Sequence, residues 1–233
     1  MQHQHIYLGL DLGKRKDFSA LALLEYTRPF IEYRNPVNWA LEQEFEDPRY
    51  AIRQLDRIPL GTKYTDVVEK VRSKLFKITQ QNYDCTLIVD ATGVGQPVIE
   101  MFHHLPARAT LVPVVITATG SETRTNDEWR VAKHDLIAGL QIMLETGKLQ
   151  ISNKLAYTSA LLEELLEFRG TTTPRGNETT EGPQDDLVIA AALAVWRARQ
   201  HEQTKSNTGF QNKDIGLHGK SPVKSGWGKT RLF

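Results

Sequence analysis

The sequence lacks the features that mark disulfide-rich, membrane-spanning or secreted proteins. It contains one cysteine, Cys85, among 233 residues. One cysteine excludes an intramolecular disulfide and a cysteine-rich zinc site, and it favours a reducing compartment. No apolar run approaches the ~20 residues that span a bilayer, and the longest plain run is Leu187–Trp196. Residues 1–7 lack the charged-then-apolar layout of a signal peptide, so we expect a cytoplasmic protein.

The chain also lacks a marked net charge, but its charges are unevenly distributed. The total is +1. Residues 205–233 contain six basic residues and one acidic residue, a net charge of +5, so residues 1–204 carry −4. The 40% hydrophobic and 24% charged fractions are those of an ordinary globular protein. An acidic body with a basic tail is the first indication of the kind of partner.

The hydrophobic pattern predicts an α/β domain over residues 1–201, followed by a basic tail over 202–233. The apolar runs at 5–12 and 18–26, joined by a short polar turn, predict a β-hairpin. Further predicted strands cover 31–45, 51–58, 85–89 and 111–117, and predicted helices cover 66–80, 96–104, 130–144, 155–168 and 185–200. The tail has too little apolar surface to offset the entropy of ordering, so we expect it to be disordered.

Four aspartates occupy unusual places in this pattern. Asp11 lies in the first apolar strand, and Asp90 ends the strand at 85–89. Asp185 and Asp186 open the last helix, which is almost wholly apolar and is therefore expected against the sheet. A buried charge is costly unless it is paired or bound to a metal. Helix capping remains an alternative role for Asp90, Asp185 and Asp186, but a strand aspartate such as Asp11 is disfavoured without a function.

Converging carboxylates of this kind indicate a divalent cation site. Oxygen-only ligands favour Mg²⁺ or Mn²⁺. A pair of such ions would activate water and stabilise the leaving oxygen in phosphodiester hydrolysis. The acids therefore predict a metal-dependent nuclease.

Four stretches carry a resemblance to a known family, and together they span most of residues 8–196. They are Gly9-Leu-Asp-Leu-Gly13, Pro59-Leu-Gly-Thr-Lys-Tyr64, Leu87-Ile-Val-Asp-Ala-Thr-Gly-Val-Gly95 and Asp185-Asp-Leu-Val-Ile-Ala-Ala-Ala-Leu-Ala194. The strand order and acid placement resemble the RNase H-like fold of the ribonuclease H and RuvC nucleases. Within that fold, the chain is similar to the C-terminal nuclease domain of the phage terminase large subunit, the DNA-packaging motor. The resemblance implies a central mixed β-sheet of antiparallel hairpin strands and parallel strands, flanked by helices.

The resemblance also implies roles for individual residues. Asp11, Asp90 and Asp186 would be the catalytic metal ligands for two Mg²⁺ or Mn²⁺ ions, and Asp185 a further or alternative ligand. Gln184 stands where the family has a histidine, and Ile189 stands where many relatives have another acid. Asp17 or Asp135 could replace that fourth acid.

The implied partners are double-stranded DNA, a separate ATPase or small terminase subunit, and the portal, in the cytoplasm of a bacterial host. No Gly-x-x-x-x-Gly-Lys-Ser/Thr phosphate loop occurs in the sequence. We therefore expect a nuclease domain that stands apart from the motor's ATPase and cannot translocate DNA by itself. Its product would be cut concatemeric viral DNA with 5′-phosphate and 3′-hydroxyl ends.

Basic residues near the acids are candidates for binding DNA. Lys14, Arg15 and Lys16 follow the Asp11 strand and would hold a phosphate beside the metals. Lys133 would neutralise the scissile phosphate. Each also has an ordinary alternative as a solvated surface residue.

Two other functions fit parts of the pattern. Gly9–Gly13 and Asp90–Gly95 resemble the phosphate loops of actin-like and sugar-kinase-like nucleotide-binding modules, although that architecture duplicates the core and leaves the paired acids of the last helix without a role. A non-catalytic DNA-packaging subunit with the same fold is the third possibility.

Overall fold

A nine-stranded β-sheet forms the centre of the computed structural model, which describes residues 2–13, 17–125, 128–170 and 184–211. The strands are β1 (Gln2–Asp11), β2 (Ser19–Arg34), β3 (Leu41–Phe45), β4 (Arg49–Ile58), β5 (Asp84–Asp90), β6 (Ala109–Thr117), β7 (Thr123–Arg124), β8 (Trp129–Ala132) and β9 (Leu149–Ile151). Their order across the sheet is β7-β8-β6-β5-β1-β2-β4-β9, and β3 pairs with β2 outside this path.

The sheet is mixed, as the sequence predicts. β1 and β2 form the expected antiparallel hairpin, and β4 continues the antiparallel part beside β2. On the other side of β1, the strands β5, β6 and β8 run parallel to β1 and to one another, and the short strand β7 pairs antiparallel with β8. The carboxyl ends of β1 and β5 therefore lie side by side at one end of the sheet.

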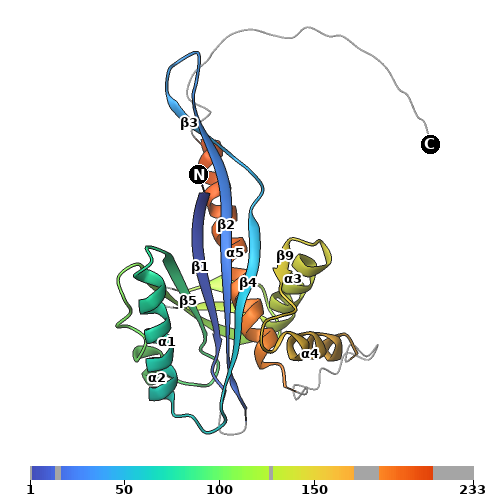
Figure 1. Cartoon of the computed structure of the whole chain (residues 1–233). Coiled ribbons are helices and arrows are strands. Elements are labelled where there is room, and N and C mark those ends of the chain that lie inside the picture. Colours follow the sequence, from blue (N-terminus) through green and yellow to red (C-terminus); the bar gives the residue numbers. More distant parts are fainter. Residues whose placement is uncertain (1, 14–16, 126–127, 171–183, 212–233) are drawn as a thin grey trace, which may run out of the picture. The chain divides into compact units, whose positions relative to one another are not determined.

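Five helices cover the two faces of the sheet in the described part of the chain (Figure 1). They are α1 (Tyr64–Thr79), α2 (Gln96–Glu100), α3 (Lys133–Glu145), α4 (Thr158–Gly170) and α5 (Asp186–Gln211). One hydrophobic cluster joins α1 and α2 to one face. A second cluster joins α3, α4 and α5 to the opposite face. The result is a three-layer α/β/α arrangement.

Alternation along the strands decides which residues face α5. In β1, Tyr7 belongs to the cluster on the α5 side, whereas Leu8 and Leu10 belong to the cluster on the α1 side. In β5, Ile88 faces α5, and its neighbours in the strand face α1. Because successive side chains alternate between faces, Asp11 falls on the α5 side with Tyr7.

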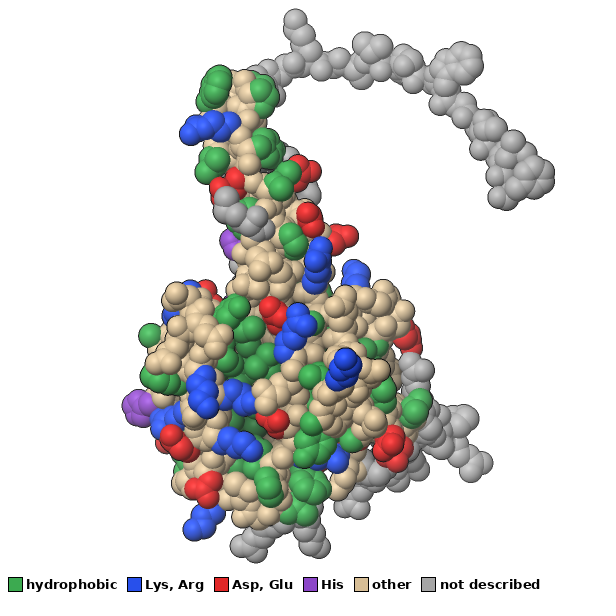
Figure 2. All heavy atoms as spheres, viewed as in Figure 1, with side chains coloured by type: hydrophobic (Ala, Val, Ile, Leu, Met, Phe, Trp, Pro, Cys, Tyr) green, Lys and Arg blue, Asp and Glu red, His purple; other side chains and the backbone are tan. Residues whose placement is uncertain are grey.

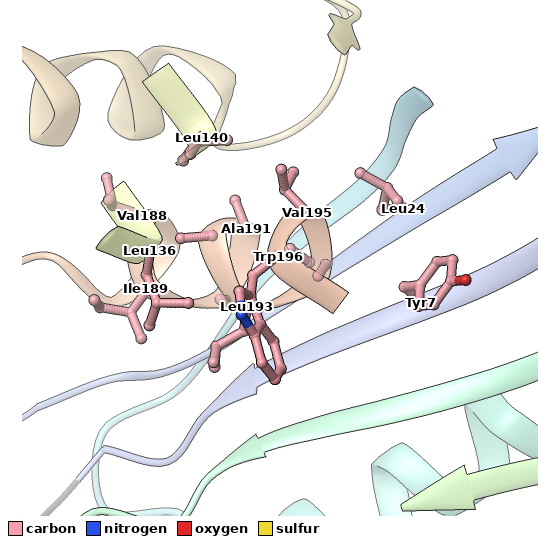
Figure 3. Packing of buried hydrophobic residues seen from close by; sticks show 14 of the residues in the cluster. Tyr7, Leu24, Leu136, Leu140, Val188, Ile189, Ala191, Leu193, Val195 and Trp196 are labelled. Carbon is pink, nitrogen blue, oxygen red and sulfur yellow. The ribbon is translucent and has the colours of Figure 1, made fainter. Parts of the chain in front are cut away.

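The first part of α5 is buried against this face, and Figure 3 shows its apolar side chains packed together with Leu136 and Leu140 of α3. Residues 187–195 are each no more than 4% exposed. The close approach depends on Gly9, because a Cβ atom there would lie 1.9 Å from the backbone oxygen of Ala190. The apolar run 187–196 correctly predicts the burial of this part of α5.

Several element boundaries differ from the prediction. The segment predicted as a helix from residue 130 begins with β8, because Trp129–Ala132 pair in parallel with Val114–Thr117 of β6. The helix predicted from residue 155 begins at Thr158, after a turn in which Tyr157 has a φ of 67°. The helix predicted over 96–104 ends at Glu100. In each case, sheet pairing or turn geometry overrides local helical periodicity.

The chain divides into two compact units, of which the first spans Met1–Gln200. Helix α5 continues to Gln211, beyond the predicted end at residue 200. The predicted boundary between body (1–201) and tail (202–233) stays a prediction, since residues 212–233 lie outside the described part of the chain. No helix within the described residues is long and apolar enough to cross a membrane.

Candidate functional site: a carboxylate cluster at the end of the sheet

The site begins where β1 and β5 end beside each other. Leu10 of β1 pairs with Val89 of β5 in parallel register, and Asp11 and Asp90 are the next residues in each strand. Each aspartate is also the last residue of its strand. Alternation turns both carboxylates toward the face covered by α5.

Helix α5 brings the other two aspartates to the same place. Asp186 is its first residue and is only 5% exposed, while Asp185 immediately precedes it and is half-buried. The backbone oxygen of Asp185 accepts the hydrogen bond from Ile189 N at 2.9 Å, so the first turn of the helix is closed. Because α5 packs on β1 at Gly9, its N-terminus is carried to the strand ends.

The electrostatics show that these aspartates act on one another. Burial raises the pKa of Asp11 well above its usual range, and the negative charges of Asp90, Asp186 and Asp185 raise it further. Burial, opposed by Arg57 and reinforced by Asp185, raises the pKa of Asp186 to about 6. Like charges that share a buried site favour the protonated form. The structure therefore brings together all four aspartates that the sequence singled out.

The loop after β5 orients Asp90. Thr92 N donates a hydrogen bond to Asp90 Oδ1 at 2.8 Å, and Thr92 Oγ1 in turn accepts one from Ile116 N at 2.8 Å. Burial raises the pKa of Asp90, and the hydrogen bonds from Thr92 oppose that shift. The turn continues through Gly93 and Gly95, whose φ angles of 69° and 80° suit glycine.

Two cations face the aspartates of α5. Lys133, the first residue of α3, places Nζ 2.5 Å from Asp185 Oδ2. Arg57, near the end of β4, places Nε 3.8 Å from Asp186 Oδ2. That separation is too long for a hydrogen bond, and neither of these two buried atoms has a hydrogen-bond partner among the described residues.

Arg57 and Glu164 belong to the site, although our sequence analysis identified neither. Arg57 Nη2 donates to Glu164 Oε1, and Glu164 Oε2 accepts a hydrogen bond from Val188 N at 3.0 Å. Glu164 of α4 therefore caps the N-terminus of α5 from another helix. Burial raises the pKa of Glu164 to about 7, although its bond from Val188 and the charge of Arg57 oppose the shift. A sequence signal existed, because Glu164 interrupts the apolar stripe of Leu161 and Leu165.

The remaining predicted residues have different outcomes. Lys14, Arg15 and Lys16 lie outside the described residues, so their role stays a prediction. Asp17 is close enough for its charge to raise the pKa of Asp186. Asp135 is exposed and pairs with His134 instead, so it does not replace the fourth acid in this structure.

The donor chemistry at the site suits a hard divalent cation. All the candidate ligands are carboxylate oxygens, and Asp186 Oδ2 is buried without a hydrogen bond from any described residue. Their arrangement is incomplete, however. Among the described residues, no three acidic, histidine or cysteine side chains are positioned to hold an ion as they stand. The pairing of Lys133 with Asp185 gives a physical reason, because the ammonium already neutralises one carboxylate.

Comparison with known proteins identifies the fold. No protein-family model and no curated protein sequence matches the chain. Among solved structures, it is similar to the large terminase nuclease from thermophilic phage G20c, with 22% identity, a TM-score of 0.53 and coverage of 83% of this chain and 82% of that one.

A Thermus thermophilus RuvC in complex with a Holliday junction substrate also matches, with 12% identity and coverage of 85% of this chain and 96% of that one. Its TM-score is 0.27. The topology and the terminase nuclease match together establish that this chain has the RNase H-like fold.

Proposed function

We propose that the protein is a metal-dependent endonuclease that hydrolyses phosphodiester bonds in double-stranded DNA, like the nuclease domain of a phage DNA-packaging terminase. The observation that carries this proposal is the convergence of Asp11, Asp90, Asp185 and Asp186. They meet from two adjacent strand ends and one buried helix N-terminus, and their charges raise one another's proton affinity.

Each residue has a proposed role. Asp11, Asp90 and Asp186 would hold two Mg²⁺ or Mn²⁺ ions, with Asp185 as a further ligand. Divalent ions bound there would activate a water and stabilise the charge that develops on the phosphate. Lys133 would exchange Asp185 for a phosphate oxygen of the DNA, since its side chain is 37% exposed and its ammonium already lies at the cluster. Thr92 orients Asp90, and Glu164 with Arg57 holds the start of α5.

The proposed substrate and partners rest on the similarity to the terminase nuclease. Concatemeric viral DNA would be cut in the cytoplasm of a bacterial host, and a separate ATPase or small subunit and the portal would supply the rest of the packaging machinery. Lys14–Lys16 and the basic residues beyond position 204 would attract the DNA backbone.

Nicking of a supercoiled plasmid tests the proposal. The full chain should nick DNA with Mg²⁺ or Mn²⁺ and not with EDTA. Asp11→Asn and Asp90→Asn should each lower the rate on the order of 100-fold or more, because several kcal/mol of charge stabilisation are lost. Asp135→Asn is the matched control, since Asp135 is exposed and paired with His134. Unchanged nicking by both cluster variants would refute the site.

A non-catalytic packaging subunit is the second candidate, and one observation favours it. Both α5 aspartates already face a cation from their own chain, Lys133 or Arg57. If these pairs are permanent, the wild-type chain will neither nick DNA nor be stabilised by Mn²⁺. The nucleotide-binding alternative has no such support, because Gly9 makes room for α5 rather than for a phosphate.

A further inference from the structure

A two-stranded arm extends from the sheet over residues 30–45. It consists of the end of β2 paired with β3, from Phe30 opposite Phe45 to Arg34 opposite Leu41. Figure 1 shows that this ribbon projects beyond the rest of the sheet. Its base is fixed to β1 by stacking of the His3, Phe30 and Phe45 rings. Since β2 is one continuous strand from Ser19 to Arg34, the arm is a stiff extension of the sheet.

The tip of the arm is a well-connected turn. Asn35 N donates to Ala40 O at 2.9 Å, and Trp39 N donates to Asn35 O at 2.8 Å. The Asn35 side chain accepts from Val37 N at 2.9 Å and donates to Glu42 at 2.6 Å. Trp39 itself has a φ of 57°, a rare conformation for a bulky residue. The turn therefore presents its side chains in a preorganised form, which lowers the entropy lost on binding.

The side chains at the tip are apolar and exposed. Val37 is 89%, Trp39 71% and Leu41 64% exposed, and Figure 2 shows hydrophobic side chains gathered at the end of the arm. The arm also carries Glu32, Glu42 and Glu44 against one base, Arg34, a net charge of −2. A negative charge disfavours DNA as the partner. The complementary partner for this surface is instead a protein groove that is both apolar and positively charged.

This same chain contains such a groove. A hollow of about 740 Å³ lies between α1 and the segment before β6. Phe76, which is 53% exposed, and Leu105 supply apolar walls, and Arg72 supplies positive charge. Glu69 and Arg108 also line the hollow, and Arg108 already pairs with Asp84. Arg72 Nε is buried and finds no acceptor among the described residues. The hollow lies at the end of the sheet where β5 and β6 begin, opposite the carboxylate cluster.

We propose that the arm tip of one molecule inserts into the α1 hollow of a second copy, in a head-to-tail contact. Trp39 packs on Phe76 and against the guanidinium of Arg72, an arrangement that favours a cation over an aromatic face. The acidic edge of the arm, with Glu44 exposed on it, faces Arg72. A tryptophan buries roughly 150–250 Å², so this small contact is weak, with a Kd on the order of 10–100 µM.

The two different surfaces give the contact a distinctive consequence. Each bound molecule still offers a free arm at one end of the assembly and a free hollow at the other. Heterologous contacts of this kind extend into rings or open filaments rather than stopping at a symmetric dimer. None of the residues involved belongs to the carboxylate cluster, so the contact is independent of nuclease activity.

Sedimentation velocity of the full chain tests the proposal. The wild-type sedimentation coefficient should rise with protein concentration and fall again at high salt, because the opposed charges are screened. Trp39→Ser on the arm and Phe76→Glu in the hollow should each keep the protein monomeric. Both positions are exposed, so folding is preserved, and thermal melting verifies it. Ile142→Ser, at another exposed apolar residue, and Lys70→Glu, elsewhere on α1, are the matched controls.

Mixing the two variants gives the decisive result. Trp39→Ser retains an intact hollow, and Phe76→Glu retains an intact arm, so an equimolar mixture should form a 1:1 dimer that does not grow. A tip-to-tip dimer would instead survive Phe76→Glu and would not be restored by mixing. Either that result, or a wild-type protein that stays monomeric at every concentration, overturns the proposal.

Discussion

At the residue scale, the carboxylate cluster that is proposed to bind metal ions also lowers the stability of the fold when it is ionised. Asp11 is half-buried beside three other aspartates, and its pKa is raised by desolvation and by their charges. A carboxyl group whose pKa is raised in the folded state loses stability as pH rises from its unfolded pKa of about 3.9 toward the folded pKa, and the loss is complete above the folded pKa. The ionised cluster is therefore a source of strain that a bound divalent cation would relieve.

The variant Asp11→Asn should therefore be more stable than the wild type in EDTA at pH 8. The gain should be a few degrees in Tm, at about 2–4 °C for each kcal/mol relieved in a chain of this size. The difference should shrink as pH falls and vanish below about pH 3, where the wild-type carboxyl is protonated in both states.

Differential scanning fluorimetry over this pH range measures both effects. Added Mn²⁺ should raise the Tm of the wild type and leave Asp11→Asn nearly unchanged. A variant less stable than the wild type at pH 8 in EDTA would contradict the assignment of Asp11 to a repulsive cluster.

Arg57 supplies the positive charge beside two buried acids, Glu164 of α4 and Asp186 of α5. It pairs with Glu164 and lies near Asp186, and its side chain is 16% exposed. Removing one partner from a buried ion pair leaves an uncompensated charge, which costs about 3–5 kcal/mol. We expect Arg57→Met to lower the free energy of unfolding by about that amount at pH 8.

Urea denaturation in EDTA measures this cost, and Glu164→Gln completes a double-mutant cycle. The double variant should recover part of the loss, since the unpaired carboxylate is gone. Additive effects within about 0.5 kcal/mol would show that the two side chains do not interact energetically.

At the scale of elements, the approach of α5 to β1 decides where the site forms. The motif Gly9-Leu-Asp-Leu-Gly13 suits a phosphate loop as well as a strand when only the sequence is considered. In the structure, Gly9 lies inside β1 and a Cβ atom there would meet the backbone of α5 at Ala190 and Ala194. The glycine therefore serves packing, and packing places Asp186 beside Asp11.

We expect Gly9→Ala to destabilise the protein by about 3 kcal/mol or more, because backbone atoms cannot move aside as a flexible side chain can. Gly139→Ala in α3 is the control, since its added methyl group would meet only the mobile end of Arg199. That substitution should be neutral or slightly stabilising, because alanine favours a helix. Chemical denaturation compares the two, and equal stabilities would refute the close contact at Gly9.

At the scale of the whole molecule, the two proposed binding surfaces of the body lie at opposite ends of the sheet. The carboxylate cluster lies where the parallel strands end, whereas the α1 hollow lies where β5 and β6 begin. The arm leaves the body near the start of β1, where His3 stacks on it. A head-to-tail contact through the arm and the hollow would therefore leave the cluster free for DNA.

The sequence by itself determined the hairpin, the parallel strands, the buried last helix and the four aspartates. These features follow from local chemistry, since alternation, apolar runs and a charged residue in an apolar strand can be recognised within about ten residues.

Only the tertiary structure decided that Arg57 and Glu164, 107 positions apart, join the site, that Lys133 pairs with Asp185, and that Trp129–Ala132 form a strand. Such partnerships depend on which segments the sheet places side by side. No periodicity within one segment contains that information.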